Sequence, residues 1–193
     1  LPFSVSVFFT SSWAFISSFF GFIPFLQEEI RTNDQMARRL DAIDRKILDE
    51  LQENGRLSIV ELAKRINLSK TPCSERVRRL EKSGVISRYR AVLNPALVDM
   101  KHVTIVHISL NRTSDSALDD FNAAVRSIPE VQSCLMIAGQ FDYMLKVRTH
   151  DIAHFREVLG EKIGKLPGVM QTHSFAVMET VKESDLIRMS REG

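Results

Sequence analysis

Apolar residues repeat at helical spacing in three short segments between residues 41 and 83. Over 41–54 they fall on one face of a predicted helix. Asn54 and Gly55 are predicted to end it, because both residues tolerate the left-handed conformation. The second helix is predicted to start at Ser58, because Glu61 follows three residues later in the pattern of a capping box. Asn67 then tolerates the positive φ that a tight turn between two helices requires.

A third helix is predicted from residue 69 or 71 to residue 83, with Pro72 in its first turn. Its inner stripe is Cys73, Val77 and Leu80, and Gly84 ends it. Residues 85–93 alternate like a pair of strands, which predicts a wing. Two short helices, a tight turn and a wing indicate a winged helix-turn-helix, in which the second helix of the motif enters the DNA major groove.

The charge of this stretch supports DNA as its partner. Residues 58–90 carry nine Lys or Arg against three Glu, whereas the whole chain has a net charge of only +2. A solvated helix face would explain any single charge here, but it does not explain the ordered combination of elements. The predicted DNA contacts are Ser69, Lys70, Thr71, Pro72, Ser74, Glu75, Arg78, Arg79, Arg88 and Arg90.

The second half of the chain has a different pattern and a balanced charge. From residue 100 onward there are eleven Lys or Arg against twelve Asp or Glu. Its periodicity predicts strands and helices in the order βαββαβ, at 102–110, 116–127, 131–138, 143–148, 151–166 and 169–178. That order is a ferredoxin-like α+β fold, with both helices on one face of an antiparallel sheet. A second copy would cover the other face, so the sequence predicts a dimer.

The expected domain boundaries follow from these patterns. Residues 37–93 form the winged helix-turn-helix domain, 94–101 a hinge, 102–185 the ferredoxin-like domain and 186–193 a tail. Residues 1–36 form an apolar extension, uncharged over its first 27 residues and of membrane-spanning length, but without the basic flank of a secretory signal. We expect this extension to lie upstream of the biological start, at Met36, or to be disordered. A membrane tether is the alternative.

The residues of both halves resemble the Lrp/AsnC, or leucine-responsive, transcription factors. The resemblance rests on LDAIDRKILDELQENGRLSIVELAKRINLS, TPCSERVRRLEKSGVI, GQFDYMLKV and LPGV, and it covers about residues 40–184. It implies an N-terminal winged helix-turn-helix and a C-terminal RAM-type domain that senses an amino acid. It also implies dimers that assemble into tetramers or octamers.

The resemblance further implies that the turn Gly139, Gln140, Phe141, Asp142, with Tyr143, contributes to an effector site. The family commonly has an acidic residue where this chain has Gln140. Gly139 permits a positive φ and exposed N–H groups for a carboxylate, while Asp142 suits an ammonium group. The alternative is an ordinary hairpin turn whose Asp caps a backbone N–H.

Enzyme and metal chemistry find little support in the sequence. His150 and His154 share a helical spacing but lack a general base between them, and no nucleophile and base pair is recognisable. We therefore expect no enzyme activity, no cofactor and no metal site. The predicted function is a cytoplasmic, nucleoid-associated regulator that binds double-stranded DNA and a free amino acid such as leucine or proline, with no membrane partner. A ligand-independent architectural protein is the other open possibility.

Overall fold

The computed structural model describes residues 40–189, which divide into two compact units. The expectations for residues 1–36, and those for 37–39 and 190–193, lie outside the described residues. One unit reaches Arg90 and includes the C-terminal segment from Leu186, and the other spans Ala91–Asp185. Residues 186–189, which we assigned to a tail, thus belong to the helical unit. There the Gln52 side chain amide donates to the Ile187 carbonyl (2.9 Å) and accepts from its N–H (2.7 Å).

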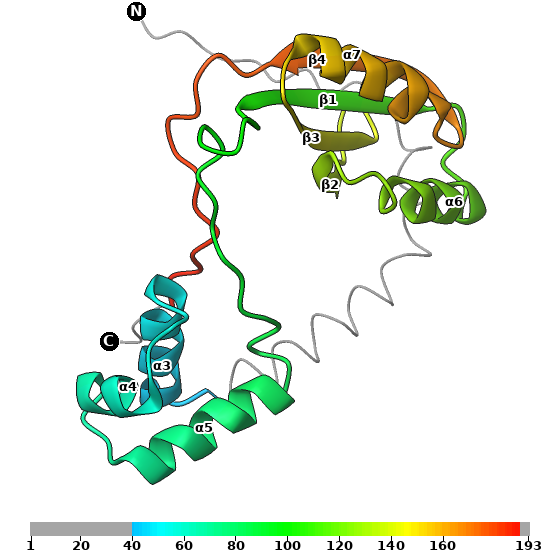
Figure 1. The fold of residues 1–193 in the computed structure, drawn as a ribbon. Coiled ribbons are helices and arrows are strands. Elements are labelled where there is room, and N and C mark those ends of the chain that lie inside the picture. The colour runs from blue at the N-terminus through cyan, green and yellow to red at the C-terminus, as the bar shows by residue number, and fades with distance from the viewer. Residues whose placement is uncertain (1–39, 190–193) are drawn as a thin grey trace, which may run out of the picture. The chain divides into compact units, whose positions relative to one another are not determined.

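The helical unit is built from α3 (Ala42–Glu53), α4 (Ile59–Arg65) and α5 (Lys70–Lys82) (Figure 1). Buried apolar residues of these helices form its small core. The predicted capping box is confirmed: the Ser58 hydroxyl accepts from the N–H of Glu61, whose carboxylate accepts from the N–H of Ser58. Asn67 has φ of 57° in the turn, as predicted. The predicted inner stripe of α5 is fully buried, and Gly84 follows that helix at φ of 78°.

The predicted wing hairpin is wrong for residues 85–93, because no strand forms there in the described chain. The segment is held by side chains instead. The Tyr89 hydroxyl donates to the Glu81 carboxylate at 3.0 Å, and a Cβ built at Gly55 would lie 3.3 Å from the Tyr89 ring. Burial and then Glu81 raise the pKa of Tyr89 to about 12. Tyr89 is thus anchored to the helical unit, whereas Val92 and Leu93 further along the segment are exposed.

The second unit is the predicted βαββαβ fold, in the order β1 (His102–Leu110), α6 (Asp115–Val125), β2 (Val131–Met136), β3 (Tyr143–Thr149), α7 (Ile152–Glu161) and β4 (Val169–Ala176). The strands lie in the order β2-β3-β1-β4, and all three pairings are antiparallel. The last predicted helix is shorter than expected, since α7 ends at Glu161 and the 3₁₀ turn η2 (Ile163–Lys165) follows.

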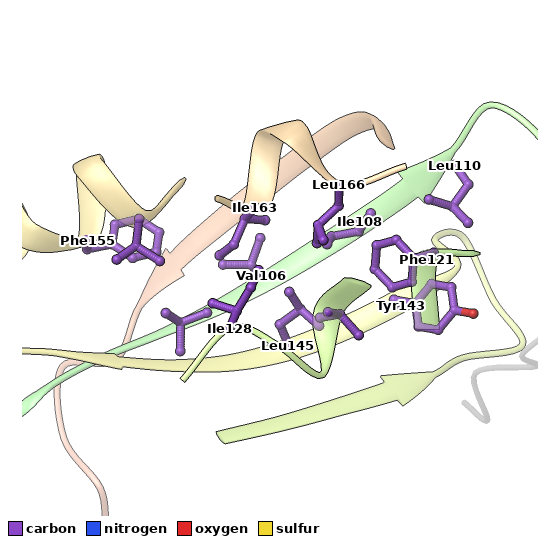
Figure 2. Close-up of a cluster of buried hydrophobic side chains, with 13 residues drawn as sticks. Val106, Ile108, Leu110, Phe121, Ile128, Tyr143, Leu145, Phe155, Ile163 and Leu166 are labelled. Atoms are coloured by element: carbon purple, nitrogen blue, oxygen red, sulfur yellow. The ribbon is translucent and has the colours of Figure 1, made fainter. Parts of the chain in front are cut away.

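The core of this unit lies between the sheet and its two helices (Figure 2). Alternate residues of β1 and β3 point into it, while Phe121 of α6 and Phe155 of α7 cover them. The ring of Phe121 packs against that of Tyr143 with centroids 4.3 Å apart. The helices do not cover the opposite face of the sheet, where Lys146 and Arg148 form ion pairs with Glu183 of the segment after β4.

Candidate DNA-binding surface and effector turn

The outer side of α5 presents a polar stripe that satisfies the requirements of a recognition helix. Lys70, Ser74 and Arg78 follow one another at intervals of four residues and lie beside the buried stripe of the same helix, with Ser74 half-buried. Lys70 and Arg78 are exposed and form no ion pair with any described residue. These cations are therefore available to phosphates and base edges.

Arg79 has a different environment from Arg78. Its Nη2 donates to both carboxylate oxygens of Asp44 on α3, at 2.8 and 2.7 Å, and Asp44 is only 1% exposed. Arg76 donates to the same carboxylate at 2.9 Å and to Asp41 at 2.6 Å. A buried carboxylate is thus neutralised by two guanidinium groups, which fix α5 against α3. The sequence does not predict this network. The i, i+3 spacing of Arg76 and Arg79 places both on neighbouring positions of α5, but nothing in the sequence links them to Asp44.

Two capping carboxylates in this unit have lowered pKa values. Burial acts to raise the pKa of Asp41, but the hydrogen bond from the Asp44 N–H and the guanidinium of Arg76 lower it below its ordinary value. Hydrogen bonds from the hydroxyl and N–H of Ser58 lower the pKa of Glu61. Both groups therefore stabilise the helices in their charged form.

The predicted effector turn connects β2 and β3. Gly139 and Gln140 are exposed, Phe141 and Asp142 are half-buried and Tyr143 is buried. Asp142 Oδ2 accepts a 2.7 Å hydrogen bond from the N–H of Leu110 at the end of β1. The Asp142 side chain therefore caps a backbone N–H, as the alternative prediction for this turn states.

Gly139 does not adopt the positive φ that glycine permits, which occurs among the described glycines at Gly84 and Gly168. A Cβ at Gly139 would make an ordinary 3.5 Å contact with Ile137.

Aromatic rings link the turn to the open face of the sheet. The Phe141 ring stacks on His107 of β1, with centroids 3.7 Å apart and an interplanar angle of 16°. Phe175 of β4 contacts the same imidazole at 4.8 Å and is 52% exposed. The turn is therefore continuous with a partly exposed aromatic cluster on this face.

Residues 40–189 contain no cluster of side chains that could hold a metal ion. His150 and His154 do stack, with ring centroids 5.2 Å apart, but no group of three metal-ligating side chains occurs among the described residues. None of the described helices has the length and apolar character needed to cross a membrane.

A compact three-helix unit with a free basic stripe, followed by a ferredoxin-like unit, defines a DNA-binding transcription regulator with a separate C-terminal domain. Sequence models agree with both halves: a winged helix-turn-helix DNA-binding model matches residues 40–87, and the Lrp/AsnC ligand binding domain model matches residues 103–187. The chain belongs to the Lrp/AsnC family. That family consists of transcription regulators, so the prediction that the chain is not an enzyme is confirmed.

Individual relatives extend over most of the chain. The proline dehydrogenase transcriptional activator of Rhodobacter capsulatus is 51% identical over 150 residues, which cover 78% of this chain and 97% of the relative. The leucine-responsive regulatory protein of Escherichia coli strain K12 is 50% identical over 146 residues, or 76% of this chain and 89% of the relative. A transcriptional regulator from Neisseria meningitidis, solved as an L-Met complex, superposes with a TM-score of 0.71 at 37% identity and covers 76% of this chain and 94% of the neighbour.

Proposed function

We propose that this protein controls genes of amino-acid metabolism by reading double-stranded DNA with α5 and by responding to a small amino acid through its C-terminal domain. The observation that carries the proposal is the unpaired basic stripe of α5, held in place by the carboxylate of Asp44 on α3. The relatives named for leucine response and for proline dehydrogenase activation make leucine and proline the first effectors to test.

The stripe of Lys70, Ser74 and Arg78 contacts base edges, and its helical neighbours Ser69, Thr71, Pro72 and Glu75 complete the major-groove surface. Exposed Arg88 and Arg90 on the segment after α5 contact phosphates. Arg79 takes a positioning role, because its guanidinium is bound to Asp44.

The DNA contact is tested by selecting bound genomic fragments with the full chain and measuring affinity for the selected site by fluorescence anisotropy. We expect Arg78→Ala to weaken binding by about 1–3 kcal/mol at fixed salt if it contacts a base edge. Arg156→Ala, an exposed arginine of α7, serves as the control and should bind like wild type. Equal affinity of both variants would remove Arg78 from the interface.

The effector lies against the turn of residues 139–143. Asp142 Oδ2 is engaged by Leu110, and Oδ1 makes no hydrogen bond with a described residue, so this oxygen is available to an ammonium group. The turn itself carries one negative charge, because residue 140 is Gln. Asp142→Asn should therefore abolish the effector response and leave DNA binding intact, whereas an unaltered response would place the effector elsewhere. A protein that ignores every amino acid tested would be the architectural alternative.

Assembly uses the open face of the sheet. Its aromatic cluster of Phe141, His107 and Phe175 is continued by Leu135, which is 50% exposed. We propose that a second copy covers this face, giving a homodimer that associates further into a tetramer or octamer. The assembly would act on the chromosome in the cytoplasm as a nucleoid-associated protein.

A further inference from the structure

A cavity of about 420 Å³ opens at the edge of the C-terminal sheet, between α6 and the edge strand β2. Its volume lies in the range of small-molecule sites, roughly 300–1,000 Å³. Val125 of α6 and Val131 of β2 supply apolar walls, and Cys134 lies at the β2 side. The cavity does not include the residues 139–142 of the effector turn.

The floor of the cavity holds an unsatisfied hydroxyl. Tyr143 is 1% exposed, and its buried oxygen makes no hydrogen bond of ordinary geometry within residues 40–189. Burial raises the pKa of this phenol to about 12, and the nearby Asn122 side chain, which also lines the cavity, acts to lower it. Figure 2 shows this oxygen at the end of the apolar cluster, directed away from the other side chains. A buried hydroxyl without a partner is costly, so this position favours a ligand atom that can accept its proton.

One charged residue, Arg126, contributes to the described cavity lining, and no carboxylate does. Arg126 forms no ion pair with a described residue, but its charge reaches Cys134: burial raises the pKa of that thiol, and Arg126 opposes the rise. The cavity therefore combines one cation, the Tyr143 hydroxyl, the uncharged polar side chains of Asn122, Gln132 and Ser133, and apolar walls. An α-ammonium group would find no opposite charge in it, whereas a carboxylate would.

We propose that this cavity is a second small-molecule site, which takes a compact 2-oxo acid with a branched apolar chain. The ligand carboxylate pairs with Arg126, its oxo group accepts from Tyr143 and its apolar chain packs on Val125 and Val131. Such acids have an oxo group in place of the ammonium group of an amino acid. The site would therefore bind the deaminated form of an amino acid. It adjoins the amino-acid site proposed at residues 139–143, with which it shares Tyr143, and it differs from that site in using Arg126 in place of Asp142.

Cys134 provides a readout for the test, because it is half-buried at the cavity whereas Cys73 is fully buried. The full chain is treated with N-ethylmaleimide, and alkylation of each thiol is followed by mass spectrometry. The probe is 4-methyl-2-oxopentanoate, compared with L-leucine. At a concentration ten times Kd, the 2-oxo acid should slow alkylation of Cys134 about tenfold, because only unliganded protein reacts.

The variants separate this site from the effector turn. Arg126→Gln and Tyr143→Phe should each weaken protection by the 2-oxo acid about tenfold or more. Asp142→Asn and the surface control Arg156→Gln should retain it. Protection by L-leucine alone, or a Cys134 that is unreactive without ligand because another subunit covers it, would overturn the proposal. A leucine response that fails in Asp142→Asn while Cys134 remains unprotected by either probe would support the turn and refute the cavity.

Discussion

Replacing Asp44 by Asn removes the single negative charge that two arginines share in the helical unit. The substitution preserves shape and keeps one acceptor oxygen, but Arg76 and Arg79 lose the carboxylate that accepts their hydrogen bonds at 2.7 to 2.9 Å. Breaking a buried ion pair costs about 3–5 kcal/mol. Arg79 is 59% exposed in its side chain and can return to water, so the loss should be smaller.

We expect a local destabilisation of about 2 kcal/mol, near the value of a hydrogen bond to a charged group. Native-state hydrogen exchange on the α3 amides measures this loss without requiring the two units to unfold together. A loss of 2 kcal/mol corresponds to exchange about 30-fold faster.

Asp49→Asn is the matched control, because Asp49 lies on the same helix but is exposed. Its α3 amides should exchange at wild-type rates. If the exchange rates of Asp44→Asn and Asp49→Asn differed by less than about threefold, the inference that the buried carboxylate fixes α5 against α3 would be refuted.

Three further outcomes are expected. Tyr143→Phe should raise the free energy of unfolding by about 1 kcal/mol in urea titrations, since it removes a buried hydroxyl without a partner; a loss of stability would show that the hydroxyl is satisfied. Because the folded pKa values of Asp41 and Glu61 are lowered, their stabilisation is present above the ordinary values of 3.8 and 4.5 and is lost as pH falls through the folded values. The Tm should therefore drop between pH 5 and pH 3, and a Tm that rose would contradict these caps. Phe175→Glu should convert the proposed dimer to a monomer in light scattering, whereas Glu at exposed Ile152 of α7 should not.

The helices and strands were predictable because their signals are local. The capping box at Ser58 and the buried stripe of α5 depend on residues within one or two turns of each other. The order of the strands and helices then leaves few topologies, and the ferredoxin-like arrangement is one of them. The strand pair expected at residues 85–93 does not form within the described chain, because alternation alone does not distinguish a strand pair from an irregular segment.

The details of the candidate sites depended on contacts between distant residues. Arg78 and Arg79 are adjacent and identical in type, yet only the structure shows that Arg79 is bound to Asp44, 35 residues earlier. Asp142 likewise caps Leu110, 32 residues away. The burial of Tyr143 results from packing of β3 against Phe121 of α6, which no spacing rule expresses.

The central claim is that an amino acid changes how this protein binds DNA. It is tested most directly by titrating the full chain onto its selected DNA site at fixed salt, with no additive, L-leucine or L-proline. A ligand shifts such an equilibrium only through different affinities for two states of the protein. The account predicts that one of these amino acids changes the DNA affinity by about fivefold or more in wild type and not in Asp142→Asn. Superimposable titrations of the wild type under all three conditions would contradict it.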